Sequence, residues 1–472
     1  MKKATLSRLP MISWKDDSER HPFANTRGTV RLITLISLLL LSFSLLLSAC
    51  AQTTQALTPH QSSNPDIYIL TVSGLTREPG ITKLDGQTRK PLWHTQPALS
   101  DVAFLIANEH LVVTGDHIYL SLFASFKTKP SKHVVYAFST REGKELWHTD
   151  FEAYERPNAA ALGWLTTPMA DNGSVYVASS VGKVYALNAS NGSLRWTYDS
   201  KMEGIFCPAK DGKGQQICAS WYNDYSAIGQ LTLTHTIIYG GIKNRFYALD
   251  AAKGTLLWSR DLPADQIIDQ PIALDGKLAY VVACTSVARD VCSINASTAD
   301  TGSPIWRTAE PYYRLEQLTI QNSTIYAVSE SNINTSISGT GVYAWNSTDG
   351  KQRWHYETPK DMIMGSSSPL LVADNRVYLG LLGVDDQKQR FMYKRLALDA
   401  ATGTIRWQIP KSYEIGDLRT IDEHIIYAGS EDTLFAYKTT DGSKLWQYTF
   451  ASISGNNQTL SITDIVVIPP SS

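Results

Sequence analysis

The chain has 472 residues, of which 43% are hydrophobic and 18% charged, a composition typical of a folded protein and not of a disordered one. Its 12 tryptophans and 23 tyrosines can supply many aromatic strands. The formal charge of −1 is unevenly distributed, because the first 49 residues carry seven Lys or Arg against three Asp or Glu. The acidic remainder argues against nucleic acid as the main partner.

An uncharged apolar run of 18 residues follows Arg27 and Arg31 and ends in Leu47-Ser48-Ala49-Cys50. Basic residues before such a run predict an export signal over residues 1–49. The final tetrapeptide resembles the bacterial lipobox, whose cysteine becomes the lipidated first residue, so we expect Cys50 to anchor the chain to a bacterial membrane. An uncleaved membrane span is the alternative, since 18 apolar residues reach the lower limit for crossing a bilayer. Both alternatives predict a periplasmic or cell-surface location for the rest of the chain.

Residues 50–65 are polar and have no apolar periodicity. This composition predicts a flexible tether with a root-mean-square reach of roughly 20 Å. We therefore expect the folded domain to occupy residues 66–472.

Segments of one design recur along this domain. Each has an apolar strand, a tight turn and a second strand that carries a tryptophan, and two further strands precede it, the nearer one carrying a tyrosine. Four strands per unit are typical of a β-propeller blade. The repeat tryptophans, which we assign to the fold, are Trp93, Trp147, Trp196, Trp258, Trp306, Trp354, Trp407 and Trp446. The sequence thus predicts an all-β fold, an eight-bladed β-propeller of four-stranded antiparallel blades.

The first copy differs from the others in two ways. Seven copies have a glycine four residues before the tryptophan, where a left-handed backbone favours glycine, but the first has Arg89, so we expect a different turn there. The first copy also has only three strands, whereas residues 461–468 form a strand that belongs to no complete unit. We expect this C-terminal strand to close the ring as the innermost strand of the first blade, leaving no unpaired edge.

The four cysteines besides Cys50 form two close pairs, Cys207 with Cys218 and Cys284 with Cys292. Outside the cytoplasm, such pairs predict local disulfides. A metal site is the alternative, but the chain has no Cys-x-x-Cys spacing and no histidine beside these cysteines.

Connection lengths predict which face of the propeller binds a partner. Loops between strands two and three share one face with the loops between blades, and the insertions fall on that face, at residues 122–132, 197–229, 284–292, 308–316, 329–341, 357–367 and 382–394. Long loops on a rigid scaffold commonly carry function, and aromatic and Arg side chains are typical of interface hot spots. The candidate binding residues are Tyr154, Arg156, Trp164, Trp221, Tyr222, Tyr225, Tyr312, Tyr313, Arg314, Met362 and Met364. The alternative is that these side chains pack the loops onto the propeller.

Four charged residues near the predicted funnel mouth, Asp269, Glu316, Asp417 and Arg419, are candidates for an ion site. Acidic residues at strand starts are more often solvated turn residues, so we predict no metal.

The pattern Ala-Leu-Asp-Ala-x-x-Gly-x-x-x-Trp, at residues 248–258 and 397–407, resembles the tryptophan-docking motif of the pyrroloquinoline-quinone (PQQ) repeat family. The resemblance covers residues 66 to about 468. It implies that each tryptophan packs between neighbouring blades and that its indole donates a hydrogen bond across the blade junction.

The same fold serves quinoprotein dehydrogenases and cofactor-free scaffolds, so the fold alone does not define the activity. The dehydrogenases use a disulfide between adjacent cysteines and a calcium site, and this chain has neither a Cys-Cys pair nor a Cys-x-x-Cys-His haem motif. Eight-bladed lipoproteins of the family, including an outer-membrane assembly subunit, are more similar. They imply a monomeric, non-catalytic, membrane-tethered scaffold that needs no cofactor and binds a protein partner in the cell envelope. The alternative is an oxidoreductase of alcohols or sugars that holds PQQ and calcium in the funnel.

Overall fold

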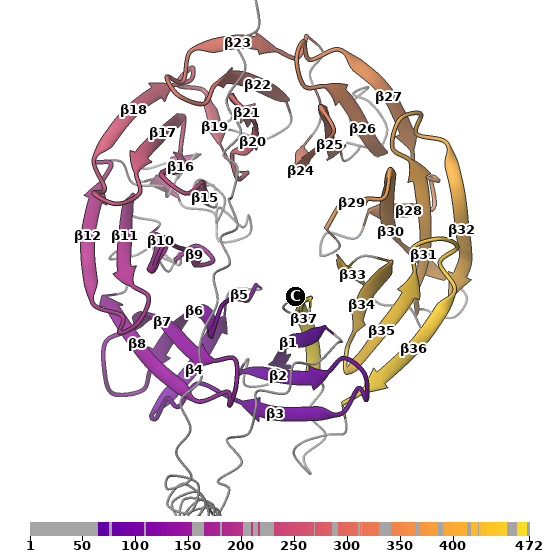
Figure 1. The fold of residues 1–472 in the computed structure, drawn as a ribbon. Helices are drawn as coiled ribbons and strands as arrows, with labels where there is room; N and C mark the ends of the chain where they lie inside the picture. The colour runs from indigo at the N-terminus through magenta and orange to yellow at the C-terminus, as the bar shows by residue number, and fades with distance from the viewer. Residues whose placement is uncertain are drawn as a thin grey trace, which may run out of the picture. The chain divides into compact units, whose positions relative to one another are not determined.

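Antiparallel four-stranded blades follow one another around a ring in the computed structural model (Figure 1). It describes residues 65–74, 78–107, 110–152, 165–179, 182–201, 209–210, 216–217, 231–268, 270–285, 291–309, 312, 314–329, 341–364, 369–385, 390–412, 417–422, 424–450 and 460–469. No helix within these ranges is long and apolar enough to span a bilayer.

The first four blades are given from the innermost strand outward. Blade 1 consists of β37 (Leu460–Ile468), β1 (Asp66–Ser73), β2 (Pro79–Asp85) and β3 (Pro91–Thr95). Blade 2 consists of β4 (Val102–Ala107) with β5 (Val112–Thr114), then β6 (His117–Phe126), β7 (Lys132–Ser139) and β8 (Glu145–Glu152). Blade 3 consists of β9 (Met169–Asp171), β10 (Ser174–Ala178), β11 (Lys183–Asn188) and β12 (Leu194–Asp199). Blade 4 consists of β15 (Thr232–Leu233), β16 (Ile237–Ile242), β17 (Arg245–Asp250) and β18 (Leu256–Asp261).

The other four blades follow the same order. Blade 5 consists of β19 (Gln266–Ile268) with β20 (Ala273–Asp275), then β21 (Leu278–Thr285), β22 (Cys292–Thr298) and β23 (Pro304–Arg307). Blade 6 consists of β24 (Leu315–Gln321), β25 (Thr324–Ser329), β26 (Gly341–Asn346) and β27 (Gln352–Glu357). Blade 7 consists of β28 (Met362–Met364) with β29 (Leu371–Ala373), then β30 (Arg376–Asp385), β31 (Arg390–Asp399) and β32 (Ile405–Ser412). Blade 8 consists of β33 (Asp417–Asp422), β34 (Ile425–Ser430), β35 (Thr433–Lys438) and β36 (Lys444–Thr449).

The innermost position is the irregular one. In blades 2, 5 and 7 it is filled by two short strands that pair with the same second strand. Between blades 3 and 4, β13 (Ala209–Lys210) and β14 (Gln216–Ile217) form a small separate hairpin. The predicted eight-bladed architecture is confirmed.

The C-terminal strand closes the ring as predicted. β37 pairs antiparallel with β1 from Asp66–Ile468 to Ser73–Leu460, which makes it the innermost strand of blade 1 (Figure 1). It also contacts both neighbouring blades, because the amide of Ile462 donates to the carbonyl of Glu431 (2.9 Å) and the amide of Leu111 donates to the Asp464 carboxylate (2.8 Å). One strand from the end of the chain therefore joins blades 8, 1 and 2.

The repeat tryptophans connect successive blades. Each of seven described indoles donates its N–H to a turn carbonyl of the next blade. These bonds run from Trp93 to Thr140 (3.3 Å), Trp147 to Ala189 (2.8 Å), Trp196 to Ala251 (3.1 Å), Trp258 to Ala299 (3.1 Å), Trp306 to Ser347 (3.1 Å), Trp354 to Ala400 (2.9 Å) and Trp407 to Thr439 (2.9 Å). The docking implied by the family resemblance is confirmed at these junctions.

The repeated tyrosine of the second strand shares this acceptor in several blades. The Tyr176 hydroxyl donates to the Ala251 carbonyl at 3.1 Å, the same oxygen that Trp196 uses, and Tyr280 and Tyr326 do the same beside their own tryptophans. A carbonyl oxygen has two lone pairs and can accept both donors. Both aromatic signatures of the repeat therefore stabilise the same junction.

The glycine before each tryptophan has two structural reasons. Gly254 has a φ of +69°, which side chains other than glycine rarely adopt, and a Cβ placed on it would lie 2.4 Å from Cε3 of Trp196. The glycine thus admits the left-handed turn and leaves room for the docking indole of the preceding blade.

Arg89 adopts the same turn, so the prediction of a different one is wrong. Its φ is +59°, its amide donates to the Asp85 carbonyl (2.8 Å), and the Asp85 amide donates to Lys90 (3.0 Å), as in the glycine turns. The Asp85 side chain accepts from the amides of Gln87 and Thr88, as Asp250 does from the amides of Ala252 and Lys253 in a glycine turn.

The side chain at this position changes the docking of the preceding tryptophan. The Arg89 guanidinium lies over the Trp446 ring, 4.9 Å from its centroid. Trp446 makes an interplanar angle of 67° with its tyrosine, whereas the seven other pairs lie between 39° and 55°. The junction that closes the ring is therefore packed differently from the rest.

The core lies between the blades, and Arg395 is an unusual member of it. Each repeat tryptophan has a cross-strand partner on the third strand of its blade. The third-strand position two residues before that partner is apolar and fully buried in seven blades, and we call it the slot. Its occupants there are Ile81, Val135, Val184, Phe246, Ile294, Val342 and Leu434. In blade 7 the slot holds Arg395, which is 2% exposed.

The Arg395 guanidinium stacks on the Tyr437 ring of blade 8, 3.2 Å from its centroid. Its Nε and Nη1 have no hydrogen-bond partner within the described part of the chain. Burial lowers the pKa of this guanidinium, and the neighbouring Tyr437 opposes that effect.

Candidate binding face

Two kinds of connection share the predicted binding face. Because neighbouring strands are antiparallel, the connections between strands two and three lie at the same end of the blade as the connections to the next blade. We call this end the long-loop face. Parts of several predicted insertions are strands and not loops. β6 continues to Phe126, the hairpin of β30 and β31 continues to Asp385 and Arg390, and β28 lies within residues 357–367.

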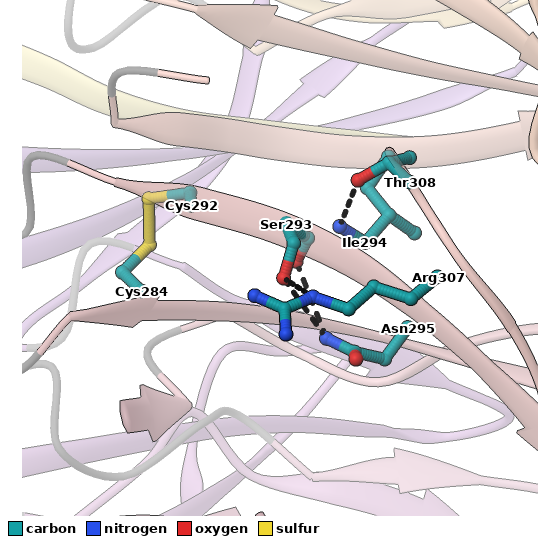
Figure 2. Close-up of a disulfide and its surroundings, with 7 residues drawn as sticks. All are labelled: Cys284, Cys292, Ser293, Ile294, Asn295, Arg307 and Thr308. Atoms are coloured by element: carbon teal, nitrogen blue, oxygen red, sulfur yellow. Dashed lines mark hydrogen bonds between the residues drawn. A yellow bond between two sulfur atoms is a disulfide. The ribbon is translucent and has the colours of Figure 1, made fainter. Parts of the chain in front are cut away.

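The disulfide between Cys284 and Cys292 lies at this face and is formed as predicted (Figure 2). The two cysteines are direct cross-strand partners on β21 and β22, with Cα atoms 4.0 Å apart, and both are buried. On β22, Ser293 accepts a hydrogen bond from Nε of Arg307 (3.0 Å), and the Ile294 amide donates to Thr308 (3.1 Å), as Figure 2 shows. The disulfide therefore fastens a hairpin end that is already well bonded to the outer strand.

Tyr312 covers the other side of this hairpin. Its backbone exchanges two hydrogen bonds with Cys292 (2.6 and 2.9 Å), and its hydroxyl accepts from the Trp345 indole (3.0 Å). The two rings meet edge to face with centroids 5.1 Å apart. Tyr312 is 4% exposed and belongs to the core between blades 5 and 6, so its predicted place in an exposed interface is wrong.

Met362 and Met364 also belong to the core. They are 3% and 6% exposed and pack between blades 6 and 7, because both point inward from β28. Their predicted place in an exposed interface is wrong for the same reason as that of Tyr312. The residue between them, Ile363, is 59% exposed and was not among the predicted binding residues.

Other predicted residues remain predictions. Arg314 is described, half-buried and in a left-handed conformation (φ +42°). The following lie outside the described residues: Cys50, Tyr154, Arg156, Trp164, Cys207, Cys218, Trp221, Tyr222, Tyr225, Asp269 and Tyr313.

One of the charged residues predicted at the funnel mouth, Arg419, contacts the closing strand. Nη2 of Arg419 donates to the Ile462 carbonyl (3.1 Å) and lies 3.8 Å from the Asp417 carboxylate. Arg419 thus holds the closing strand against blade 8. Within the described part, no group of three His, Cys, Asp or Glu residues is placed to hold a metal ion.

A pocket of about 410 Å³ opens between blades 1 and 2 at the long-loop face. Its lining is Glu78, Pro79, Gln96, Pro97, Ala98, Leu99, Ser100, Val102 and Leu105. The exposed lining is polar and apolar in nearly equal parts, with one carboxylate, that of Glu78, next to β2.

Comparison with known proteins identifies the family. The family model described as "Outer membrane protein assembly factor BamB" matches residues 131–214 and 291–469, more than half of the chain. The chain belongs to this family. The protein of that name from Yersinia pestis is 23% identical over 326 residues, which cover 65% of this chain and 70% of the relative.

Two further proteins are similar to this chain, one over a short segment and the other over most of its length. The dehydrogenase subunit of a quinone-dependent alcohol dehydrogenase from Gluconobacter oxydans is 30% identical over 116 residues, but the match covers 25% of this chain and only 13% of the relative. The crystal structure of BamB from Moraxella catarrhalis aligns with 81% of this chain and 91% of its own, at 13% identity and a TM-score of 0.48.

Proposed function

We propose that the protein is a lipid-anchored scaffold of outer-membrane protein assembly that acts by protein contact through its long-loop face. The observation that carries this proposal is membership of the assembly-factor family over more than half of the chain. The Leu-Ser-Ala-Cys sequence that ends at Cys50 supports the anchor and an extracytoplasmic location.

The closed ring supports a scaffolding role physically. Seven described junctions are fixed by an indole hydrogen bond, and β37 removes the free inner edge of blade 1. A surface held by such a ring loses little conformational freedom when a partner binds, so more of the contact energy remains as affinity.

The quinoprotein alternative has less support from the residues present. The chain has no adjacent cysteines, which the quinoprotein dehydrogenases of this fold use. The matched segment covers only 13% of the Gluconobacter subunit. If purified protein with PQQ and calcium chloride gains several degrees in melting temperature and reduces a dye with ethanol or glucose, the scaffold proposal is wrong.

The proposal is tested by deleting the gene in its source bacterium and measuring folded β-barrel proteins in the outer membrane by heat-modifiable gel mobility. We expect the folded barrels to fall several-fold and to recover with the wild-type gene. A Cys50→Ser variant should lose palmitate labelling and recover poorly, whereas Cys284→Ser should keep the label. Unchanged barrel levels after deletion would contradict the proposed function.

A further inference from the structure

The central hairpin of blade 7 is longer than that of blade 8. β30 and β31 have 10 residues each, whereas β34 and β35 have 6 each. When the two blades are aligned on their equivalent pairs, Tyr378 with Ala397 and Tyr427 with Ala436, the blade 7 ladder continues for four more pairs, from Leu382–Tyr393 to Asp385–Arg390. At about 3.3 Å per residue, the hairpin extends about 13 Å further toward the long-loop face.

Alternation along β30 shows which side chains of this extension face the blade 8 side. Leu379 and Leu381 pack against blade 6, whereas Tyr378 packs against blade 8. Leu382 and Val384 have the same parity as Tyr378 and therefore face the blade 8 side. β30 and β31 lie beside β34 and β35 in Figure 1, and the blade 8 hairpin ends before it reaches the four additional pairs.

Four side chains form an apolar surface on this side, which we call the overhang: Ile363, Leu382, Val384 and Tyr393. Ile363 and Tyr393 are the direct cross-strand partners of Leu382, so all four share one sheet face. Ile363 is 59% and Val384 51% exposed, and the other two are half-buried. Most other large exposed aliphatic residues lie on the outermost strands, spread over separate blades. The overhang instead gathers its apolar side chains on one sheet face.

The base of the overhang is acidic. Burial, and then the charges of Asp417 and Glu431, raise the pKa of the Tyr393 hydroxyl, so both carboxylates lie near it. Arg419 opposes them and lies 3.8 Å from the Asp417 carboxylate, so the net negative charge of the three groups is that of Glu431. Glu431 is exposed at the turn of the blade 8 hairpin, directly beneath the additional pairs in register.

We propose that the overhang docks an extended segment of a protein partner that carries aliphatic side chains next to a lysine or arginine. The aliphatic side chains cover Ile363 and Val384, the Tyr393 ring provides a large rigid contact, and the basic group faces Glu431. The height of about 13 Å accommodates roughly four extended residues, so the contact is small and we expect an affinity in the micromolar range. This inference rests on the proposed function, because it specifies where the partner of the scaffold binds.

A synthetic peptide tests the site directly. The probe is a fluorescein-labelled, end-capped decapeptide of alternating Val and Lys, titrated with the full folded chain by fluorescence anisotropy. We expect binding that weakens with salt, and at least tenfold weaker binding by the Ile363→Lys/Val384→Lys variant. Leu194→Lys is the matched control, because Leu194 is equally exposed (56%) on the outermost strand of blade 3. All variants should melt near the wild-type temperature, since the substituted side chains are exposed.

Charge reversal tests the acidic base. Glu431→Lys should weaken binding of the Val-Lys peptide and strengthen binding of a peptide in which Glu replaces Lys. If the double variant binds as wild type does, or if the Glu peptide binds wild-type protein as tightly as the Lys peptide, the overhang is not the site.

The cellular assay separates this inference from the proposed function. Where deletion lowers the folded barrels, the Ile363→Lys/Val384→Lys gene should restore them less well than the Leu194→Lys gene. Equal restoration by both genes would overturn the overhang and leave the scaffold intact. An unaffected deletion strain would overturn the scaffold, and the peptide titration would then decide the overhang alone.

Discussion

Alanine at Gly254, a turn glycine that contacts a docked indole, should destabilise the propeller far more than alanine at Gly276, a turn glycine with open space around it. Gly254 and Gly276 both have a left-handed backbone, with φ of +69° and +59°. A Cβ at Gly276 would meet nothing within 4 Å, whereas a Cβ at Gly254 would lie 2.4 Å from the Trp196 ring. The pair therefore separates backbone strain from the overlap with the indole.

The magnitudes differ clearly. Placing alanine in a left-handed conformation costs about 1 to 2 kcal/mol at either site. At Gly254 the ring must also move, although its N–H is bonded to the Ala251 carbonyl at 3.1 Å. Overpacking adds about 1 to 3 kcal/mol, and a weakened indole hydrogen bond adds about 1 kcal/mol. We expect Gly254→Ala to lower the free energy of unfolding by about 3 to 6 kcal/mol and Gly276→Ala by about 1 to 2 kcal/mol.

Equilibrium unfolding in urea, followed by tryptophan fluorescence and circular dichroism, measures the difference, provided that the two probes and the m-values agree. In a Trp196→Leu background the ring is absent, so the two alanine substitutions should have similar effects. If Gly254→Ala in the wild-type background is no worse than Gly276→Ala, the indole does not require the glycine and the docking explanation is refuted.

Three other substitutions or deletions give clear expectations. Arg395→Leu should raise the free energy of unfolding, measured in urea, by about 1 to 3 kcal/mol. The two N–H groups of Arg395 that have no hydrogen-bond partner within the described part of the chain should cost more free energy than its stacking on Tyr437 contributes. A loss of stability would contradict this expectation. The hydrogen bonds from Arg406 and then Thr402 lower the pKa of Asp399 to about 2, so its stabilisation is present above the unfolded pKa and is lost as the pH falls through about 2. Asp399→Asn should thus lower the melting temperature at pH 7 but hardly at pH 2, and an equal loss at both would show that its charge is not involved. Removal of residues 458–472 should lower the melting temperature and cause aggregation, since β37 leaves the ring, and an unchanged melting curve with soluble protein would refute the closure.

The blades and their closure could be predicted because each depends on local patterns. Tryptophan spacing, alternating apolar strands and turn residues mark every copy, and a strand left over at residues 461–468 has one vacant position to fill. The prediction of a different turn at Arg89 is wrong because it treats glycine as necessary. The Asx hydrogen bonds of Asp85 match those of Asp250 in a glycine turn, and Arg89 keeps the turn at a positive φ.

The binding face was harder to predict, because strands there resemble loops. The sequence predicts a connection at residues 357–367, but Met362, Ile363 and Met364 form β28 there, with both methionines buried and Ile363 exposed. The alternation of two side chains that differ little in hydrophobicity gives no sequence signal for which one faces inward. Burial of Tyr312 likewise depends on Trp345, which is 33 residues away in the chain and contributes its indole donor.

The repeat itself acts as an internal control for unusual residues. A feature that seven blades lack is not needed to form a blade, and two such features lie at the borders of blade 8. Among the described residues, Arg395 stacks on Tyr437 where blade 7 meets blade 8, and Arg89 stacks on Trp446 where blade 8 meets blade 1. At the first border the buried guanidinium of Arg395 replaces the apolar side chain of the slot. At the second border Trp446 is rotated and contacts Arg89 where the other indoles contact a glycine.

We expect both replacements to weaken the borders of blade 8, so blade 8 should open before the others. Hydrogen exchange followed by mass spectrometry should show lower protection in β34 and β35 than in β16 and β17 of blade 4, whose strands have the same length of 6 residues. Arg395→Leu should slow exchange in β35 without changing β17. Equal protection of the two blades would contradict this expectation. It would mean that the contacts of β37 stabilise blade 8 at least as much as Arg395 and Arg89 destabilise it.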